Sequence, residues 1–210
     1  MLKVIIFDFD GTIADTFDTI VGISNRLARE FGYKPAAPEQ IEQIKSLSSR
    51  EIIRQSGVSI FKVPLILRKL KAELNNEIHR LIPLPGIPDA LAEIRIKGYK
   101  LGIITSNDRE NVMLFLQNNQ LQELFDFIYS EATIFGKNRA INLFLKQHKL
   151  KPEEAIYVGD ETRDIEAAKK SNIKMIAVSW GFNSETVLAK HKPDFLIHQP
   201  SEMIQVISKL

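Results

Sequence analysis

The sequence contains no cysteine, no long apolar run and no excess of charge of one sign. Without cysteine, disulfide bonds, thiolate nucleophiles and thiolate metal sites are excluded, so oxygen or imidazole must hold any bound metal. The 28 Lys and Arg residues nearly balance the 26 Asp and Glu residues, which leaves a net charge of only +2. Because the basic residues are dispersed along the chain, we expect no nucleic acid partner.

The apolar stretches are too short for a secretory signal or a membrane span. The amino-terminal run, residues 4–7, ends at Asp8, whereas a signal peptide needs about 7–15 apolar residues and a membrane helix about 20. We therefore expect a cytoplasmic protein with no membrane partner. Its 210 residues, 44% hydrophobic and 26% charged, are ordinary for a globular protein of one or two domains.

Short apolar runs alternate with longer stretches of helical spacing from residue 84 onward. This alternation is typical of βαβ units. We therefore predict an α/β fold, with a Rossmann-like parallel sheet and helices on both of its faces. The predicted strands are residues 4–7, 101–104, 127–129, 155–158, 175–178 and 195–197.

Residues 17–82 interrupt this alternation, because they carry helical stripes and no strand signal. Within them, Ser48 to Glu51 forms a capping-box pattern that predicts a helix start, and Gly57 marks the end of that helix. Asp15 and Thr16 are expected to cap the first helix. We predict that residues 1–15 and 84–210 form the α/β core, and that residues 16–83 form an inserted all-α domain.

Carboxylates follow two of the predicted strands. Asp8 and Asp10 come directly after the first, and Asp160, Glu161 and Asp164 follow the strand at 155–158. Each group alone has an ordinary explanation, as a turn or as favourable charge at a helix start. Ligands of parallel sheets bind beyond the carboxyl ends of the strands, so together these acids form a pool that needs a cation. With oxygen ligands, and histidines that share no metal-ligand spacing, Mg²⁺ is the natural choice.

Two further segments suit phosphate binding. Thr105, Ser106 and Asn107 follow the strand at 101–104, where a hydroxyl and backbone N–H groups can hold phosphate oxygens. The same residue types are also common helix caps. Lys137 precedes another helical stretch and, taken alone, would be an ordinary surface lysine.

In combination, these segments resemble the haloacid dehalogenase-like hydrolase superfamily, and within it the phosphoglycolate phosphatase and β-phosphoglucomutase-like branch. The resemblance spans nearly the whole chain. The matching segments, in family order, are Asp8-Phe9-Asp10-Gly11-Thr12, Leu84-Pro85-Gly86, Thr105-Ser106-Asn107, Lys137, Gly159-Asp160 and Asp164-Ile165-Glu166-Ala167-Ala168.

The resemblance implies a role for each motif residue. Asp8 is expected to be the nucleophile, and Asp10 the general acid and base. Thr105 and Lys137 are expected to stabilise the phosphoryl group, with Ser106 and Asn107 beside it. The expected Mg²⁺ ligands are Asp8, the backbone carbonyl of Asp10, Asp160 and Asp164. Family members often carry Ser or Thr where this chain has Glu161, so Glu161 receives no role.

The inserted domain corresponds to the helical cap of that family. Its segment 44–51 resembles the part of the cap that contacts the leaving group, which points to Lys45 and Arg50 as substrate-binding residues. Ser46 stands where the family commonly has glycine, and Arg50 also fits a solvated helix surface. The expected partner is a small phosphorylated metabolite, and the chain is expected to be a monomer or a homodimer.

The function that this resemblance implies is Mg²⁺-dependent hydrolysis of a small phosphomonoester, phosphoglycolate-like or a sugar phosphate, through an aspartyl-phosphate. A phosphomutase of the same branch is the nearest alternative, since it uses the same intermediate. A dehalogenase of this fold is disfavoured because that chemistry needs no acid at Asp10. A receiver-like phospho-acceptor also places acids, a hydroxyl and a lysine at strand ends, but receivers are shorter and lack a helical insert.

Overall fold

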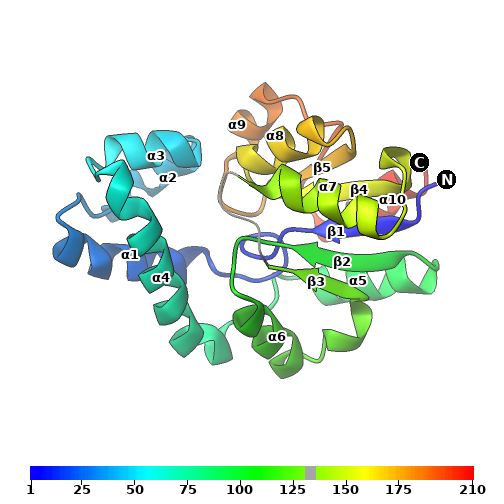
Figure 1. Ribbon diagram of the computed structural model, residues 1–210, viewed down its shortest axis with the longest axis horizontal. Helices are drawn as coiled ribbons and strands as arrows, with labels where there is room; N and C mark the ends of the chain where they lie inside the picture. The colour runs from blue at the N-terminus through cyan, green and yellow to red at the C-terminus, as the bar shows by residue number, and fades with distance from the viewer. Residues whose placement is uncertain (131–135) are drawn as a thin grey trace.

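Six parallel strands form one sheet at the centre of the protein (Figure 1). The computed structural model describes residues 1–130 and 136–210. The strand order is β3-β2-β1-β4-β5-β6, so the first strand lies between β2 and β4. Every run predicted as a strand lies in one, and three strands are one residue longer. The strands are β1 (Val4–Phe7), β2 (Lys100–Ile104), β3 (Phe127–Tyr129), β4 (Ala155–Gly159), β5 (Lys174–Val178) and β6 (Phe195–Ile197).

Both faces of the sheet are buried under helices, which confirms the predicted α/β architecture. In β1, Ile5 and Phe7 pack into one hydrophobic cluster, whereas Val4 and Ile6 pack into the other. Side chains alternate between the faces of a strand, so a strand apolar at every position must be covered on both sides. One face is covered by α5 (Ile87–Ile96), α6 (Arg109–Asn118) and α10 (Met203–Ile207), and the other by α7 (Lys137–Gln147), α8 (Thr162–Lys170) and α9 (Glu185–Lys190).

Residues 16–83, called the helical insert below, stand to one side of the sheet in Figure 1 and contain helices but no strand. The insert leaves and re-enters the α/β part through paired segments: Leu84 N–H donates to Ile13 O at 2.9 Å, and Asp15 N–H donates to Ile82 O at 3.0 Å. Its α-helices are α1 (Phe17–Phe31), α2 (Ile41–Lys45), α3 (Ser49–Gln55) and α4 (Val63–Glu77).

Capping was predicted correctly at one helix of the insert and wrongly at another. At α3, Glu51 N–H donates to Ser48 Oγ, and the Glu51 carboxylate accepts the Ser48 N–H at 2.8 Å, so the capping box is present. At α1, Thr16 is the N-cap residue but its side chain makes no capping hydrogen bond. Its backbone is helical (φ −109°, ψ −6°), not extended as an N-cap residue usually is.

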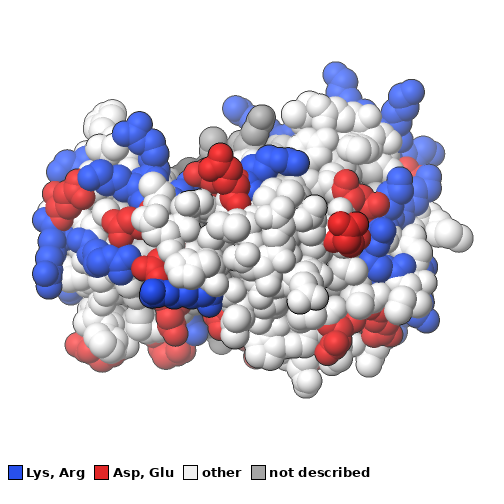
Figure 2. All heavy atoms as spheres, turned by 90° about the horizontal axis from the view of Figure 1, so that it is seen from below, with Lys and Arg blue, Asp and Glu red and all other residues white. Residues whose placement is uncertain are grey.

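The exposed surface carries charges of both signs. Figure 2 shows acidic and basic side chains interspersed on the insert and around the rim of the α/β part. On the face shown, the charges therefore do not form a stripe of one sign. Among residues 1–130 and 136–210, no helix combines the length and the apolar character that crossing a membrane requires.

Candidate active site

The sheet order brings the predicted motifs to adjacent strand ends. Phe7, the last residue of β1, is in register with Ile103 of β2 and Val158 of β4. Asp8 N–H then donates to Val158 O at 2.8 Å. Because all three strands are parallel, the segments that follow them meet at one edge of the sheet.

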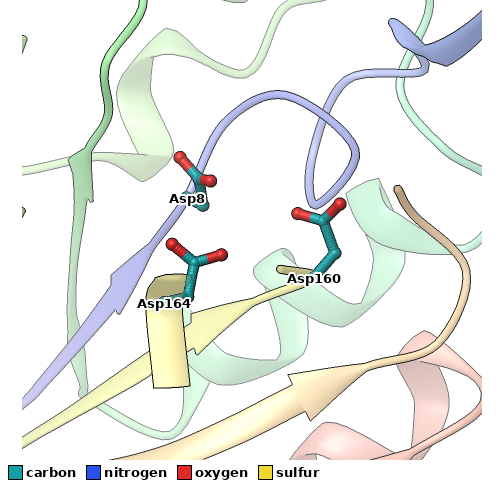
Figure 3. Close-up of side chains that lie close together, drawn as sticks. All are labelled: Asp8, Asp160 and Asp164. Atoms are coloured by element: carbon teal, nitrogen blue, oxygen red, sulfur yellow. The ribbon is translucent and has the colours of Figure 1, made fainter. Parts of the chain in front are cut away.

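Three acids form a buried cluster at this edge. Figure 3 shows the side chains of Asp8, Asp160 and Asp164 lying close together, at the end of β1, at the end of β4 and in the first turn of α8. One oxygen of each lies within 4.8 Å of the others, and none of the three residues is more than 1% exposed. Burial raises the pKa of Asp160 well above its usual value, and the charges of Glu161 and Asp8 raise it further. Burial also raises the pKa of Asp164 to about 6, although Lys137 opposes this.

Lys137 is the cation that the described residues place inside this cluster. It is the first residue of α7 and is only 2% exposed, unlike an ordinary surface lysine. Its Nζ lies 2.7 Å from Asp8 Oδ2 and also contacts Asp164 Oδ1. Burial lowers the pKa of Lys137, but Asp164 and Asp8 outweigh it and the net shift is upward. Arg163 also acts on Asp8 and Asp164 through its charge, but its ion pair is with Glu161. Three acids around one lysine form an oxygen-only donor set, which fits a hard divalent cation such as Mg²⁺.

Two glycines let the chain approach Asp160 closely. Gly11 has φ +73°, and a Cβ there would overlap the Asp160 carboxylate and the Phe182 ring. A Cβ at Gly181 would also overlap Asp160. In this space Asp160 accepts hydrogen bonds from Thr12 Oγ1 and from Phe182 N–H, both at 2.7 Å. These two bonds fix the direction in which the carboxylate points.

Asp10 is held separately from the cluster. Asn107 Nδ2 donates to both of its carboxylate oxygens, at 3.1 and 3.0 Å. Burial and the charge of Asp8 raise the pKa of Asp10 to about 7, against the lowering effect of the Asn107 hydrogen bond. A carboxyl group with a pKa near neutrality can both give and take a proton at physiological pH.

The segment after β2 is buried beside Asp10. Thr105 is fully buried, and its hydroxyl accepts the Asn107 N–H at 3.0 Å. Ser106 is partly buried between them. The structure therefore brings Asp8, Asp10, Asn107, Lys137 and the two acids after β4 together.

The two basic residues expected to bind substrate lie on the insert. Lys45 Nζ lies 4.6 Å from the centroid of the Phe17 ring, so its ammonium is held against an aromatic face. Arg50 lines a cavity of about 270 Å³ between α3 and α8, together with Arg163. This cavity places one arginine from the insert and one from the α/β part on a common wall.

Two residues that connect the insert to the site were assigned no such role from the sequence. Glu161 accepts hydrogen bonds from Ser49 of α3 at 2.9 Å and from Arg163 at 2.7 Å, so it joins the insert to the acidic loop. Asn183 donates to the carbonyls of Lys45 and Leu47 and accepts from Thr162 N–H. A lone asparagine or glutamate in a polar loop fits many local roles, so only their partners in space distinguish these residues.

The comparisons with known proteins agree with this geometry. The family model described as haloacid dehalogenase-like hydrolase matches residues 5–178. A phosphoglycolate phosphatase from Synechococcus elongatus is 37% identical over 209 residues, covering 100% of this chain and 99% of the relative. A pyrophosphatase PpaX from Bacillus cereus is 26% identical over 214 residues, with 100% and 98% covered.

A solved structure supports the same assignment. A haloacid dehalogenase-like family hydrolase from Streptococcus pneumoniae superposes with a TM-score of 0.83 at 25% identity, over 98% of each chain. With a family match over most of the chain, a full-length relative and a common fold, this chain belongs to the haloacid dehalogenase-like hydrolases and is an enzyme of their phosphoglycolate phosphatase-like branch.

Proposed function

We propose that this enzyme is a Mg²⁺-dependent phosphatase that hydrolyses a small phosphomonoester through a phosphorylated Asp8. The placement of Asp8 is the observation that supports this most directly, because its carboxylate lies against Lys137 and within 4.8 Å of two further buried acids. A phosphate can approach a carboxylate only if positive charge reduces the repulsion between the two anions. Lys137 and a divalent cation would supply that charge.

Asp8, Asp160 and Asp164 would hold the cation, together with the backbone carbonyl of Asp10. When bound, Mg²⁺ would act as a Lewis acid on the phosphoryl oxygens. Lys137 would remain next to Asp8 and contact the same phosphoryl group. The Thr105 hydroxyl at the end of β2 would donate to another of its oxygens, since charge stabilisation is most of what phosphoryl transfer requires.

In the first step, an Asp8 oxygen would attack phosphorus and the bond to the leaving oxygen would break. Asp10, in its protonated form, would transfer its proton to that oxygen. In the second step the Asp10 carboxylate would take a proton from a water molecule, which attacks the phosphorus of the phosphorylated Asp8. Inorganic phosphate leaves, and Asp8 and the protonated Asp10 are regenerated.

We propose a leaving group that carries a second anionic group. The relatives are named for phosphoglycolate and for pyrophosphate, which both contain one. The cavity between α3 and α8 is lined by Arg50 and Arg163 and also by Glu51 and Glu166. Its two arginines are the groups suited to bind a carboxylate or a phosphate.

We also propose that the insert acts as a cap domain over this site. Ser49 donates to Glu161, so α3 is attached to the acidic loop after β4. Asn183 donates to the carbonyls of Lys45 and Leu47, so the turn before α3 is attached to the segment between β5 and α9. Closure of such a domain excludes water while the phosphoenzyme forms.

The test is phosphate release from 2-phosphoglycolate, pyrophosphate, a sugar 1-phosphate and p-nitrophenyl phosphate, with Mg²⁺ and with EDTA. We expect metal-dependent turnover of at least one anionic substrate and none with Asp8→Asn. Full activity in EDTA, or in Asp8→Asn, would contradict the mechanism. Isomerisation of the sugar phosphate without release of phosphate would favour a phosphomutase.

A further inference from the structure

Three asparagine side chains connect Asp10 to helix α4 of the insert. Asn107 Nδ2 donates to Asp10, Asn111 Nδ2 donates to Asn107 Oδ1 at 2.9 Å, and Asn75 Nδ2 donates to Asn111 Oδ1 at 2.6 Å. Asn107 and Asn111 are 3% and 1% exposed, whereas Asn75 lies at the surface of α4. A continuous row of amides therefore runs from the site to the outside of the insert.

The direction of this row is fixed from its inner end. The backbone N–H of Asp108 donates to Asn107 Oδ1 at 2.7 Å, so this oxygen faces away from Asp10 and Asn107 presents its Nδ2 to the Asp10 carboxyl group. Asn111 must then turn its own Nδ2 inward and its Oδ1 toward Asn75. If the amide of Asn111 were flipped, its Oδ1 would lie against Asn107 Oδ1 and would have no donor there. An unsatisfied buried polar group of this kind costs about 1–3 kcal/mol.

Asn111 is attached to α4 at both ends of its amide. Its Nδ2 also donates to Lys71 O at 3.2 Å, and its Oδ1 accepts from Asn75, which lies four residues further along the same helix. Next to these bonds, Lys71 Nζ lies 3.0 Å from Asp108 Oδ1. These contacts attach α4 to residues 107–111, which include Asn107, the residue that donates to Asp10.

We propose that Asn111, supported by Asn75 of the insert, is a positioning residue that orients the Asp10 carboxyl group for proton transfer to the leaving group. Asn107 touches Asp10 directly, and Asn111 acts through Asn107. The inference rests on the proposed role of Asp10 as the general acid. It adds that the insert controls this acid through an amide row that is separate from the segment 44–51, where Lys45 and Arg50 are expected to bind substrate.

A defect in proton transfer has a signature that a general loss of structure lacks. An alkyl leaving group needs a proton as it departs, whereas p-nitrophenolate is stable enough to leave without one. The experiment compares kcat/KM for 2-phosphoglycolate and for p-nitrophenyl phosphate, with Mg²⁺ present. General acid catalysis typically contributes about 10²- to 10⁴-fold to the rate. The quantity of interest is the ratio of kcat/KM for 2-phosphoglycolate to kcat/KM for p-nitrophenyl phosphate, called the substrate ratio below. Asp10→Asn shows how far this ratio falls when the general acid is lost.

The first test variant is Asn111→Leu, which removes both hydrogen-bonding ends at nearly constant size. We expect kcat/KM for 2-phosphoglycolate to fall about tenfold or more, with a much smaller loss for p-nitrophenyl phosphate. The control is Asn119→Ala. Asn119 lies at the end of the same helix and donates to Leu81 O, which joins α6 to the insert without reaching Asp10. We expect no change in the substrate ratio for this control.

The second test variant, Asn75→Asp, changes the row from the surface and carries little risk to folding. An aspartate there cannot donate to Asn111 Oδ1, and it attracts the Asn111 Nδ2 outward. The Asn111 amide is therefore favoured to flip, so that its oxygen and not its Nδ2 faces Asn107. We expect a selective loss of 2-phosphoglycolate turnover that exceeds the loss in Asn75→Ala. Asn76→Asp adds the same charge at the next exposed residue and should leave the ratio unchanged.

The outcomes separate the two proposals. If Asp10→Asn itself shows no preference for the activated substrate, the assignment of Asp10 as the general acid is wrong. If Asp10→Asn shows that preference but folded Asn111→Leu and Asn75→Asp keep the wild-type ratio, or lose both substrates equally, the positioning role is wrong. A selective loss in both variants, with unchanged ratios in Asn119→Ala and Asn76→Asp, supports it.

Discussion

Lys137 Nζ lies 2.7 Å from Asp8 Oδ2, with both side chains almost completely buried. Lys137 also contacts Asp164, so one ammonium group forms ion pairs with two carboxylates, which follow different strands. The buried charge of the site is therefore unbalanced in the metal-free protein, and this imbalance determines how the protein should respond to mutation, pH and metal.

Lys137→Met should destabilise the protein strongly at alkaline pH. Removing one partner of a buried ion pair costs about 3–5 kcal/mol, because the remaining charge stays buried and unpaired. We expect a loss of this size in the free energy of unfolding at pH 8 in EDTA, and a smaller loss at pH 5, where raised pKa values let Asp160 and Asp164 become protonated. Urea unfolding at both pH values measures this. Lys146→Met, on the exposed end of α7, is the control, and an equal loss at the two pH values would contradict the prediction.

Mg²⁺ should stabilise the folded protein through the acidic cluster. A ligand at 100 times its Kd adds about 2.7 kcal/mol to the stability of the state that binds it. We expect the Tm in EDTA to rise by several degrees when Mg²⁺ replaces the chelator, and most of this rise to disappear in Asp160→Asn. In EDTA, Asp160→Asn should itself be more stable than the wild type, since it removes a buried like charge. Glu153→Gln, at an exposed acid, should keep the full response to Mg²⁺.

Asp10 should make stability fall as the pH rises in the absence of metal. Its pKa is about 7 in the folded protein against 3.8 as the ordinary value, so the folded state favours the protonated form. The resulting stabilisation is complete below about pH 4 and is lost as the pH rises toward 7. The full shift corresponds to about 4 kcal/mol, which partial exposure reduces to about 1–2 kcal/mol. We expect Asp10→Asn to gain this much over the wild type between pH 4 and pH 8 in EDTA. A constant difference between the two proteins across that range would show that the carboxyl group is not held in its neutral form.

Arg50→Ala should affect substrates according to their leaving groups. A charge-assisted hydrogen bond is worth about 1.5–3 kcal/mol, so kcat/KM for a substrate with a second anionic group should fall about 10- to 150-fold. Activity on p-nitrophenyl phosphate should change little. Arg54→Ala, one turn further along α3 and exposed, is the matched control. Equal losses on both substrates would indicate that the mutation disturbs the insert as a whole. No loss on either would show that Arg50 does not contact the substrate and belongs to the solvated surface of the helix.

The strands and the acids at their ends could be predicted from the sequence because both signals are local. Val4 to Phe7 is apolar at every position, which requires a strand covered on both faces, and Asp8 follows it directly. Parallel strands place their carboxyl ends at one edge of the sheet. The convergence of Asp8, Asp160 and Asp164 therefore follows from the alternation of strands and helices, without any knowledge of the individual contacts.

The amide row and the attachment of the insert were decided only by the tertiary structure. Asn75 and Asn111 are separated by 36 residues, and Asn183 and Leu47 by 136. In the sequence, each of these asparagines fits a helix cap, a turn or the solvated surface equally well. An amide specifies neither its partner nor its orientation. Packing of α4 against α6 supplies the partner, and the hydrogen bond from the Asp108 N–H to Asn107 Oδ1 fixes the orientation.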